Sequence, residues 1–258
     1  MLELNNVTKI FNKGTPNEKI ALNNVSLTLR DEDFVTIIGG NGAGKSTLMN
    51  IISGKMKPDS GRILIDGKDI TNMSEHKRAK FFGRVFQDPL MGTAANMLIE
   101  ENLSVASLRG KRRTLRFGIS KKERAKYKEL LKELDLGLED RLKTEVGLLS
   151  GGQRQALTLL MASMNNPKLL LLDEHTAALD PKTSAKVLAI TDKIVNENRL
   201  TTLMITHNMH DAIIHGNRLI MMNNGEIALD ISGEEKNNLT VKSLLDRFDG
   251  MASDRLLL

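Results

Sequence analysis

A glycine-rich segment from Gly39 to Thr47 has the residue types that bind phosphate groups. It reads Gly-Gly-Asn-Gly-Ala-Gly-Lys-Ser-Thr and fits the pattern G-x-x-x-x-G-K-[ST]. Glycines let backbone N–H groups close around phosphate oxygens, and the helix expected after them adds the positive end of its dipole. The lysine suits β and γ phosphates, and the Ser46 hydroxyl suits Mg²⁺. The residues expected to contact a nucleotide are Gly39, Asn41, Gly42, Ala43, Gly44, Lys45, Ser46 and Thr47.

Two acidic residues, Asp173 and Glu174, follow directly after the four leucines 169–172. A continuous apolar run is typical of a parallel strand buried on both faces. Open parallel sheets bind ligands outside the carboxyl ends of their strands, so these acids should face the same crevice as the phosphate-binding loop. Asp173 can then hold Mg²⁺, directly or through water. Glu174 can polarise an attacking water as a general base. The alternative is a strand that simply ends in solvated acids.

A third segment, Leu149-Ser150-Gly151-Gly152-Gln153, has the pattern of a helix start. Ser150 can cap the helix while the Gln153 side chain reaches back to it. This local interpretation does not explain two glycines in the first turn, each of which costs a helix about 1 kcal/mol relative to alanine. Their use favours a ligand that approaches the backbone closely, and a helix N-terminus favours an anion. The sequence therefore predicts a second phosphate-binding helix start.

The elements that must position these segments alternate between strands and helices, which indicates an α/β sheet. Periodicity predicts strands within residues 2–10, 25–29, 34–38, 61–66, 169–172 and 200–206. It predicts helices at 45–53, 181–196, 208–215 and 241–248. The sequence Asn223-Asn-Gly225 predicts a tight turn between two late strands. A mostly helical block at 96–148 interrupts the alternation and is the expected subdomain.

Three more features accompany the segments described above: Gln87 in Val85-Phe-Gln-Asp-Pro89, the segment Ala178-Leu-Asp180, and His207. Together and in their order along the chain, these segments resemble those of the ATP-binding-cassette (ABC) ATPases. The resemblance covers about residues 1–232. It implies a P-loop NTPase (ABC ATPase) core of class α/β, with an antiparallel β subdomain and an inserted α-helical subdomain at about 90–165. Residues 233–258 are then a C-terminal helical tail.

The resemblance also implies roles for single residues and for partners. Two copies pair head to tail, and ATP lies between the loop of one copy and Ser150, Gly151, Gly152 and Gln153 of the other. Glu174 activates water, Gln87 contacts Mg²⁺ and senses the helical subdomain, and His207 contacts the γ phosphate. Asp180 lies at the dimer interface, and Phe11 lies where the family places an aromatic ring against adenine.

His175 departs from the commonest family pattern, in which proline follows the acid pair. One branch of the family has a similar sequence at Asp173-Glu-His-Thr-Ala-Ala-Leu-Asp-Pro181. This branch contains the ATPases of bacterial amino-acid importers that serve tryptophan or tyrosine. A structural role for His175 and a role in tuning the proton affinity of Glu174 both stay open. The resemblance implies transmembrane permease subunits as partners and an extracytoplasmic substrate-binding protein as an indirect partner.

The charge of the chain is concentrated in one segment. The net charge is +5, but Arg109–Lys128 holds ten lysines and arginines and one acid, Glu123. A solvated loop followed by a helix, a contact with anionic lipid headgroups and nucleic-acid binding are the three interpretations of this segment. Phe117 and Tyr127 are too sparse for a base-stacking surface, so no nucleic acid is expected as a partner.

Composition bounds the remaining function classes. Hydrophobic residues make up 40% and charged residues 27% of the 258 residues, which indicates a globular chain. The absence of cysteine excludes disulfides and thiol catalysis. No apolar run approaches the ~18 residues of a membrane span, so other subunits must provide the spans if the chain works at a membrane. The resemblance implies a peripheral protein at the cytoplasmic face of the cell membrane. The alternatives are an exporter ATPase and a soluble ABC-superfamily ATPase that acts on nucleic acid or ribosomes.

Overall fold

The computed structural model describes residues 1–111 and 118–254, and the side chains up to residue 247. The strands are β1 Leu2–Phe11, β2 Lys19–Leu29, β3 Phe34–Gly39, β4 Ser60–Ile65, β5 Lys68–Asp69, β6 Phe82–Val85, β7 Leu169–Asp173, β8 Thr202–Ile205, β9 Arg218–Asn223 and β10 Glu226–Ser232. The α-helices are α1 Lys45–Ser53, α2 Glu75–Arg78, α3 Ile99–Ser107, α4 Lys121–Lys132, α5 Gly151–Ser163, α6 Pro181–Glu197, α7 Met209–Ile214, α8 Gly233–Asn237 and α9 Val241–Asp254. Short 3₁₀ turns lie at Pro89–Gly92 and Val146–Leu148.

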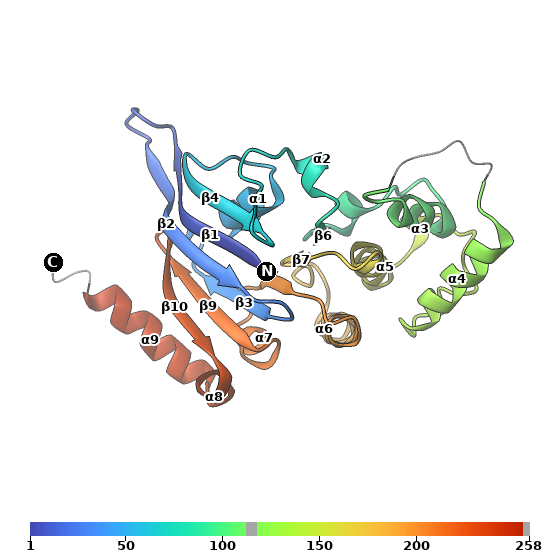
Figure 1. Ribbon diagram of the computed structural model, residues 1–258. Helices are drawn as coiled ribbons and strands as arrows, with labels where there is room; N and C mark the ends of the chain where they lie inside the picture. Colours follow the sequence, from blue (N-terminus) through green and yellow to red (C-terminus); the bar gives the residue numbers. More distant parts are fainter. Residues whose placement is uncertain (112–117, 255–258) are drawn as a thin grey trace.

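A six-stranded sheet with the order β10-β9-β3-β8-β7-β6 forms the centre of the molecule (Figure 1). Every pairing in it is parallel except that of β10 with β9. The five parallel strands therefore present their carboxyl ends at one edge of the sheet. Gly39, Asp173 and the residues after Ile205 meet at this edge, so three of the predicted chemical segments converge there.

A second sheet is antiparallel, with the order β2-β1-β4-β5. Its apolar face packs with α1 and one face of the central sheet in a core that includes Leu4, Val25, Leu48, Ile63 and Ile205. These side chains are at most 2% exposed, so α1, which follows the phosphate-binding loop, is packed firmly between the two sheets. The antiparallel sheet agrees with the β pattern predicted for the first thirty residues.

The segment between β6 and β7 carries α3, α4 and α5 and reaches away from the antiparallel sheet (Figure 1). Its apolar residues join β7 and α6 in a second core that includes Leu103, Leu131, Leu157 and Leu172. The prediction of a mostly helical stretch at 96–148 is only partly right. Leu134, Leu138 and Val146 are buried there in a turn-rich segment instead of an α-helix. Their apolar spacing resembles that of a helix, but it arises because residues distant in the sequence bury them.

The basic segment Arg109–Lys128 lies partly outside the described residues, since 112–117 are not described. In its described part, Arg109 donates to the carbonyls of Ala162 and Met164 at 2.6 and 2.8 Å. Arg124 forms two hydrogen bonds with the Glu100 carboxylate at 2.7 and 3.0 Å. These two arginines therefore help to hold the helical segment together, and α4 is the helix expected at the end of the basic stretch.

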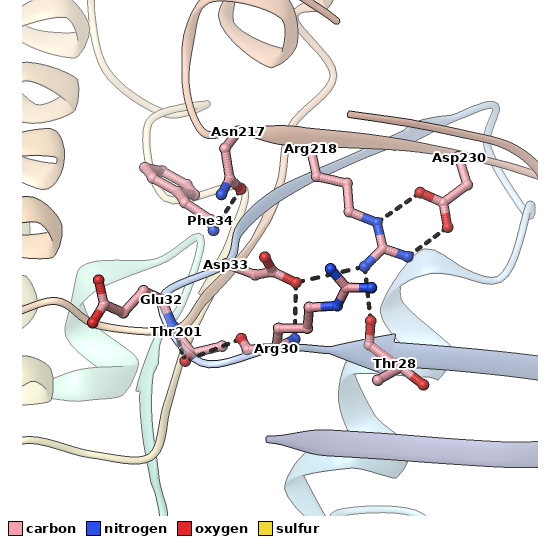
Figure 2. A network of polar contacts seen from close by, with 9 residues as sticks. All are labelled: Thr28, Arg30, Glu32, Asp33, Phe34, Thr201, Asn217, Arg218 and Asp230. Carbon is pink, nitrogen blue, oxygen red and sulfur yellow. Dashed lines mark hydrogen bonds and ion pairs between the residues drawn. The ribbon is translucent and has the colours of Figure 1, made fainter. Parts of the chain in front are cut away.

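The amino ends of β3 and β9 are held by a polar network at the other edge of the central sheet (Figure 2). Arg218 forms two hydrogen bonds with Asp230, at 2.6 and 2.5 Å, and donates to the carbonyl oxygen of Thr28 at 2.7 Å. Its guanidinium also lies 3.6 Å from Asp33. The network ties β9 and β10 to the end of β2 and lies on the edge opposite the phosphate-binding loop.

The chain ends with α8, which packs beside β9 and β10, and with α9, which contacts α7 (Figure 1). The buried Lys236 ammonium donates to the carbonyls of Ile213, His215 and Gly216 at 2.7–2.9 Å and so closes the end of α7. None of the helices within 1–111 and 118–254 is long and apolar enough to cross a membrane.

Candidate nucleotide-binding site

The phosphate-binding loop connects β3 to α1, as the sequence predicts, and two of its glycines are required by the backbone. Gly39 has φ 150°, and a Cβ there would lie 2.3 Å from the carbonyl oxygen of Met222. Gly44, the residue before α1, has φ 104°, and a Cβ there would lie 2.4 Å from the carbonyl oxygen of Ala21. A side chain at either position is therefore excluded by both conformation and space.

The Lys45 ammonium lies inside the loop. It donates to the carbonyl oxygens of Gly39 and Gly40 at 2.7 and 3.1 Å, and the residue is only 5% exposed. Burial lowers the pKa of Lys45, an effect that the nearby charge of Glu174 opposes. A buried cation that bonds only to neutral carbonyls retains most of its attraction for an anion, which suits a phosphate receptor.

A cavity of about 200 Å³ opens over the loop. Its walls come from the loop, from the antiparallel sheet and from the ends of β7 and β8, and consist of Phe11, Lys19, Ala21, Asn41, Gly42, Ala43, Gly44, Lys45, Ser46, Thr47, Glu174 and His207. The structure therefore brings together most of the predicted nucleotide contacts with the predicted base and the predicted γ-phosphate contact.

Phe11 and Lys19 form the part of the cavity wall that comes from the antiparallel sheet. They are opposite each other in the β1–β2 pairing, and the Lys9 ammonium lies 5.9 Å from the centre of the Phe11 ring. The Lys19 ammonium lies 3.0 Å from the place that a Cβ on Gly42 would occupy, so it stands directly over the loop. No sequence motif identifies Lys19, because only the register of β1 against β2 brings it to the cavity.

Glu174 and His207 are paired across the ends of β7 and β8. The His207 Nε2 lies 2.5 Å from a Glu174 carboxylate oxygen, and the side chains are 47% and 13% exposed. Glu174 has φ 48°, an uncommon conformation for a residue with a side chain, and its N–H donates to the carbonyl of Ile205 at 3.0 Å. Strained residues of this kind cluster at functional sites. A carboxylate held beside an imidazole can take a proton from water.

Asp173 is the last residue of β7, and its carboxylate accepts a hydrogen bond from Arg84 at 2.8 Å. Arg84 also donates to Asn50 and Ser53 of α1, at 3.0 and 3.2 Å. No sequence motif identified Arg84. Gln87 lies two residues beyond β6 at the same edge of the sheet, but it is exposed and does not line the cavity.

Oxygen donors of the predicted metal site are present at this edge. In the described part of the chain no group of three or more His, Cys, Asp or Glu side chains could hold a metal ion. The predicted donors are instead the hydroxyl of Ser46, the amide of Gln87 and the carboxylate of Asp173, which are oxygen ligands of mixed type. Such a set suits Mg²⁺, which usually takes only one or two protein carboxylates and completes its shell with water and substrate phosphates.

The segment Ser150–Gln153 starts α5 and lies apart from the cavity. The predicted capping box is present: the Gln153 N–H donates to the Ser150 hydroxyl at 3.3 Å, and the Ser150 N–H donates to the Gln153 side chain at 3.2 Å. The Gln153 amide also donates to the carbonyl of Leu136. A Cβ on Gly152 would lie 2.2 Å from Cγ2 of Thr183, so packing on α6 is one reason for this glycine.

Asp180 and His175 lie in the loop after β7, and both form hydrogen bonds within the chain. Asp180 caps α6 by accepting from the Thr183 N–H at 3.1 Å. The His175 ring is 2% exposed, and its Nε2 lies 3.1 Å from the Thr191 hydroxyl. That hydroxyl donates to the carbonyl of Val187, so Nε2 carries the proton and donates. Burial, with a smaller effect from the charge of His215, lowers the pKa of His175 to about 4.

Comparison with known proteins gives a consistent family. The family model described as "ABC transporter" matches residues 22–177. A tyrosine transport ATP-binding protein of Clostridioides difficile is 48% identical over 249 residues, which cover 96% of this chain and 99% of that protein. The energy-coupling factor transporter ATP-binding protein EcfA2 of Acetivibrio thermocellus is 33% identical over 88% of this chain and 78% of its own length.

Solved structures support the same assignment. A dimeric post-hydrolysis structure of the ATP-binding cassette MJ0796 bound to ADP and Pi has a TM-score of 0.75 and 32% identity, and the match covers 90% of this chain and 98% of that one. The predicted ABC ATPase fold is thereby confirmed. The chain belongs to the family of ABC transporter ATP-binding subunits, the ATPases that couple ATP hydrolysis to transport.

Proposed function

We propose that this chain powers the import of an amino acid, with tyrosine or tryptophan as the cargo. The observation that carries the proposal is the 48% identity to the tyrosine transport ATP-binding protein along almost the whole of both chains. A methionine import ATP-binding protein of Corynebacterium efficiens is 36% identical over 88% of this chain and 61% of its own length. Its name favours import, and the higher identity favours an aromatic cargo over methionine.

The cavity over the loop supports a nucleotide-binding role for its lining residues. ATP phosphates would be held by the backbone of residues 39–47 and by Lys45, and adenine would pack on Phe11. Ser46, Gln87 and Asp173 would hold Mg²⁺, which when bound neutralises phosphate charge.

The pair Glu174 and His207 supports the hydrolytic step. The Glu174 carboxylate accepts a proton from the attacking water, since it is held by its backbone and by the imidazole at 2.5 Å. His207 is 47% exposed and faces the same cavity, so it can contact the γ phosphate.

The position of the start of α5 outside the cavity supports a head-to-tail dimer. Ser150 and Gly151 are exposed and lie outside the cavity, so a second copy would bring its own Ser150–Gln153 segment to the phosphates, with Asp180 at the interface. The MJ0796 cassette is dimeric in its complex with ADP and Pi.

Transport further requires permease subunits in a membrane, and an extracytoplasmic substrate-binding protein would deliver the amino acid to them. The chain would then act at the cytoplasmic face of the membrane. We also propose the division into one ABC ATPase domain at 1–232, with the helical subdomain at about 90–165, and a C-terminal helical tail at 233–258.

Amino-acid uptake by a strain that lacks the gene for this chain tests the cargo. Wild-type chain should restore uptake of labelled tyrosine or tryptophan, whereas the Glu174→Gln variant should not, because it lacks the proposed base. Labelled methionine is the matched control substrate. Restored methionine uptake with unchanged tyrosine and tryptophan uptake would contradict the proposed cargo, and equal restoration by both chains would contradict the role of Glu174.

A further inference from the structure

Arg84 is a largely buried cation near the carboxyl ends of the strands of the central sheet. It is the third residue of β6, opposite Leu171 of β7, and its side chain is only 11% exposed. A buried charge costs free energy unless it is paired and hydrogen-bonded. Arg84 is paired with Asp173 at 2.8 Å, and among residues 1–111 and 118–254 no other hydrogen bond to that carboxylate is found.

The same guanidinium also holds the helix that starts at the phosphate-binding loop. It donates to the side chains of Asn50 and Ser53, at 3.0 and 3.2 Å. These residues follow Ser46 by four and seven positions, and residues with this spacing share one face of a helix. Arg84 therefore bonds to the face of α1 that carries Ser46, while it also bonds to Asp173.

A third contact links Arg84 to the segment that carries Gln87. The guanidinium carbon lies 4.8 Å from the centre of the Phe86 ring, a distance at which a cation is attracted to an aromatic face. The carbonyl of Phe86 accepts a hydrogen bond from Gln155 of α5 at 3.2 Å. The segments that carry the three proposed Mg²⁺ ligands therefore all contact Arg84 or its direct neighbour Phe86. Phe86 in turn is bonded to α5 of the helical segment.

We propose that Arg84 is a positioning residue for the ATPase reaction, which fixes the Asp173 carboxylate against α1 and sets how strongly Mg²⁺ tightens nucleotide binding. The inference rests on the proposed function, because it takes Ser46, Gln87 and Asp173 as the oxygen donors. A planar guanidinium can bond to three acceptors in fixed directions at once. A lysine ammonium keeps the charge but is a point donor on a flexible stem and cannot keep this bridge.

Binding of a fluorescent, non-hydrolysable ATP analogue, titrated with Mg²⁺ and repeated in EDTA, tests the inference. Arg84→Lys should raise the Mg²⁺ concentration for half-maximal tightening about tenfold or more, the usual effect of losing an outer partner of a metal ligand. Binding of the analogue in EDTA should stay within about twofold, since Arg84 does not line the phosphate cavity. Equal changes with and without Mg²⁺, or no change in either, would overturn the proposal.

Arg218→Lys is the matched control. Arg218 is a similarly buried arginine of the same sheet, 19% exposed and bonded to Asp230 and Thr28 (Figure 2), but it lies at the opposite edge. This variant should leave the Mg²⁺ dependence unchanged. An equal shift in Arg218→Lys would show that general destabilisation causes the effect and would overturn the positioning role.

Two further variants keep the result decisive. Asp173→Asn should itself weaken the response to Mg²⁺, and if it does not, the proposed metal site fails and the inference fails with it. If Asp173→Asn has its effect and Arg84→Lys has none, only the inference fails. Should Arg84→Lys not fold, the double variant Asn50→Ala, Ser53→Ala removes the acceptors on α1. It should raise the required Mg²⁺ about threefold, and an unchanged requirement would overturn the proposal.

Discussion

Replacing Gly152 by alanine separates two reasons for the glycines at the start of α5. The sequence favours a ligand that approaches the backbone, whereas the structure shows that the missing side chain leaves room for Thr183 of α6. A Cβ on Gly152 would lie 2.2 Å from the Thr183 Cγ2 and 3.7 Å from its Cβ. Ordinary contact of two carbons begins near 3.5 Å, so Cγ2 must move if position 152 carries a Cβ.

Whether Gly152→Ala raises or lowers the free energy of unfolding should depend on whether the Thr183 methyl group is present. Alanine in place of glycine stabilises a helix by up to about 1 kcal/mol, while overpacking of this kind costs about 1–3 kcal/mol. Gly152→Ala alone should therefore lower the free energy of unfolding, by up to about 2 kcal/mol. In a Thr183→Ser background, which removes Cγ2 and keeps the hydroxyl, the same change should raise it, by up to about 1 kcal/mol.

Urea denaturation of the four chains in this double-mutant cycle measures the coupling directly. Two residues in packing contact should show a coupling energy of about 1–3 kcal/mol. An equal effect of Gly152→Ala in both backgrounds would refute the packing argument. ATP-driven dimerisation then tests the ligand argument separately. A double variant that is stable but does not dimerise would show that Gly152 also meets the partner copy's nucleotide, and one that dimerises normally would leave packing as the reason.

The other predictions concern the cavity and its neighbours. Glu174→Gln should reduce phosphate release at least a hundredfold while the affinity for ATP stays within a few-fold, and normal turnover would remove Glu174 as the base. Lys45→Ala should weaken ATP binding at least tenfold in an equilibrium titration, since a charged hydrogen bond contributes about 1.5–3 kcal/mol. Lys19→Ala should weaken it about three- to tenfold, whereas the exposed Lys13→Ala should not; equal effects would deny Lys19 a place at the phosphates. His175→Pro should lower the melting temperature but keep turnover within a few-fold, and a large loss of turnover would show that the histidine contributes to the chemistry.

Local signals in the sequence predict the elements that begin and end with them. Helix α1 is predicted and observed at Lys45–Ser53, because the glycine loop precedes it and Gly54, with φ 85°, ends it. Strand β7 is predicted from its four leucines and extends by one residue, to Asp173. The turn between β9 and β10 is confirmed, with Asn224 and Gly225 at φ 47° and 80°. The candidate site at the carboxyl edge follows from these elements.

The sequence does not predict contacts that depend on distant partners. Strand β6 contains a glycine and the buried Arg84, whose partners lie 31–89 positions away in the sequence. Lys19 reaches the cavity only through the register that places it opposite Phe11. His175 is equally consistent in sequence with a catalytic and a structural role, and its hydrogen bond to Thr191 of α6 favours the structural one.

In the proposed head-to-tail dimer, the start of α5 completes the site at the Gly39–Thr47 loop of the other copy. A helix leaves its first N–H groups without intrahelical partners. The capping box satisfies those of Ser150 and Gln153 from within the chain. Gly151 is exposed, so its N–H can meet an anion, whereas Gly152 is buried against Thr183 of α6. This helix start lies outside the cavity that holds Lys45 and Glu174, so in the proposed dimer a phosphate would meet one set of donors from each copy. In that proposed dimer, ATP binding would also be an assembly step, and hydrolysis would remove the group that bridges the two copies and so move attached permease subunits.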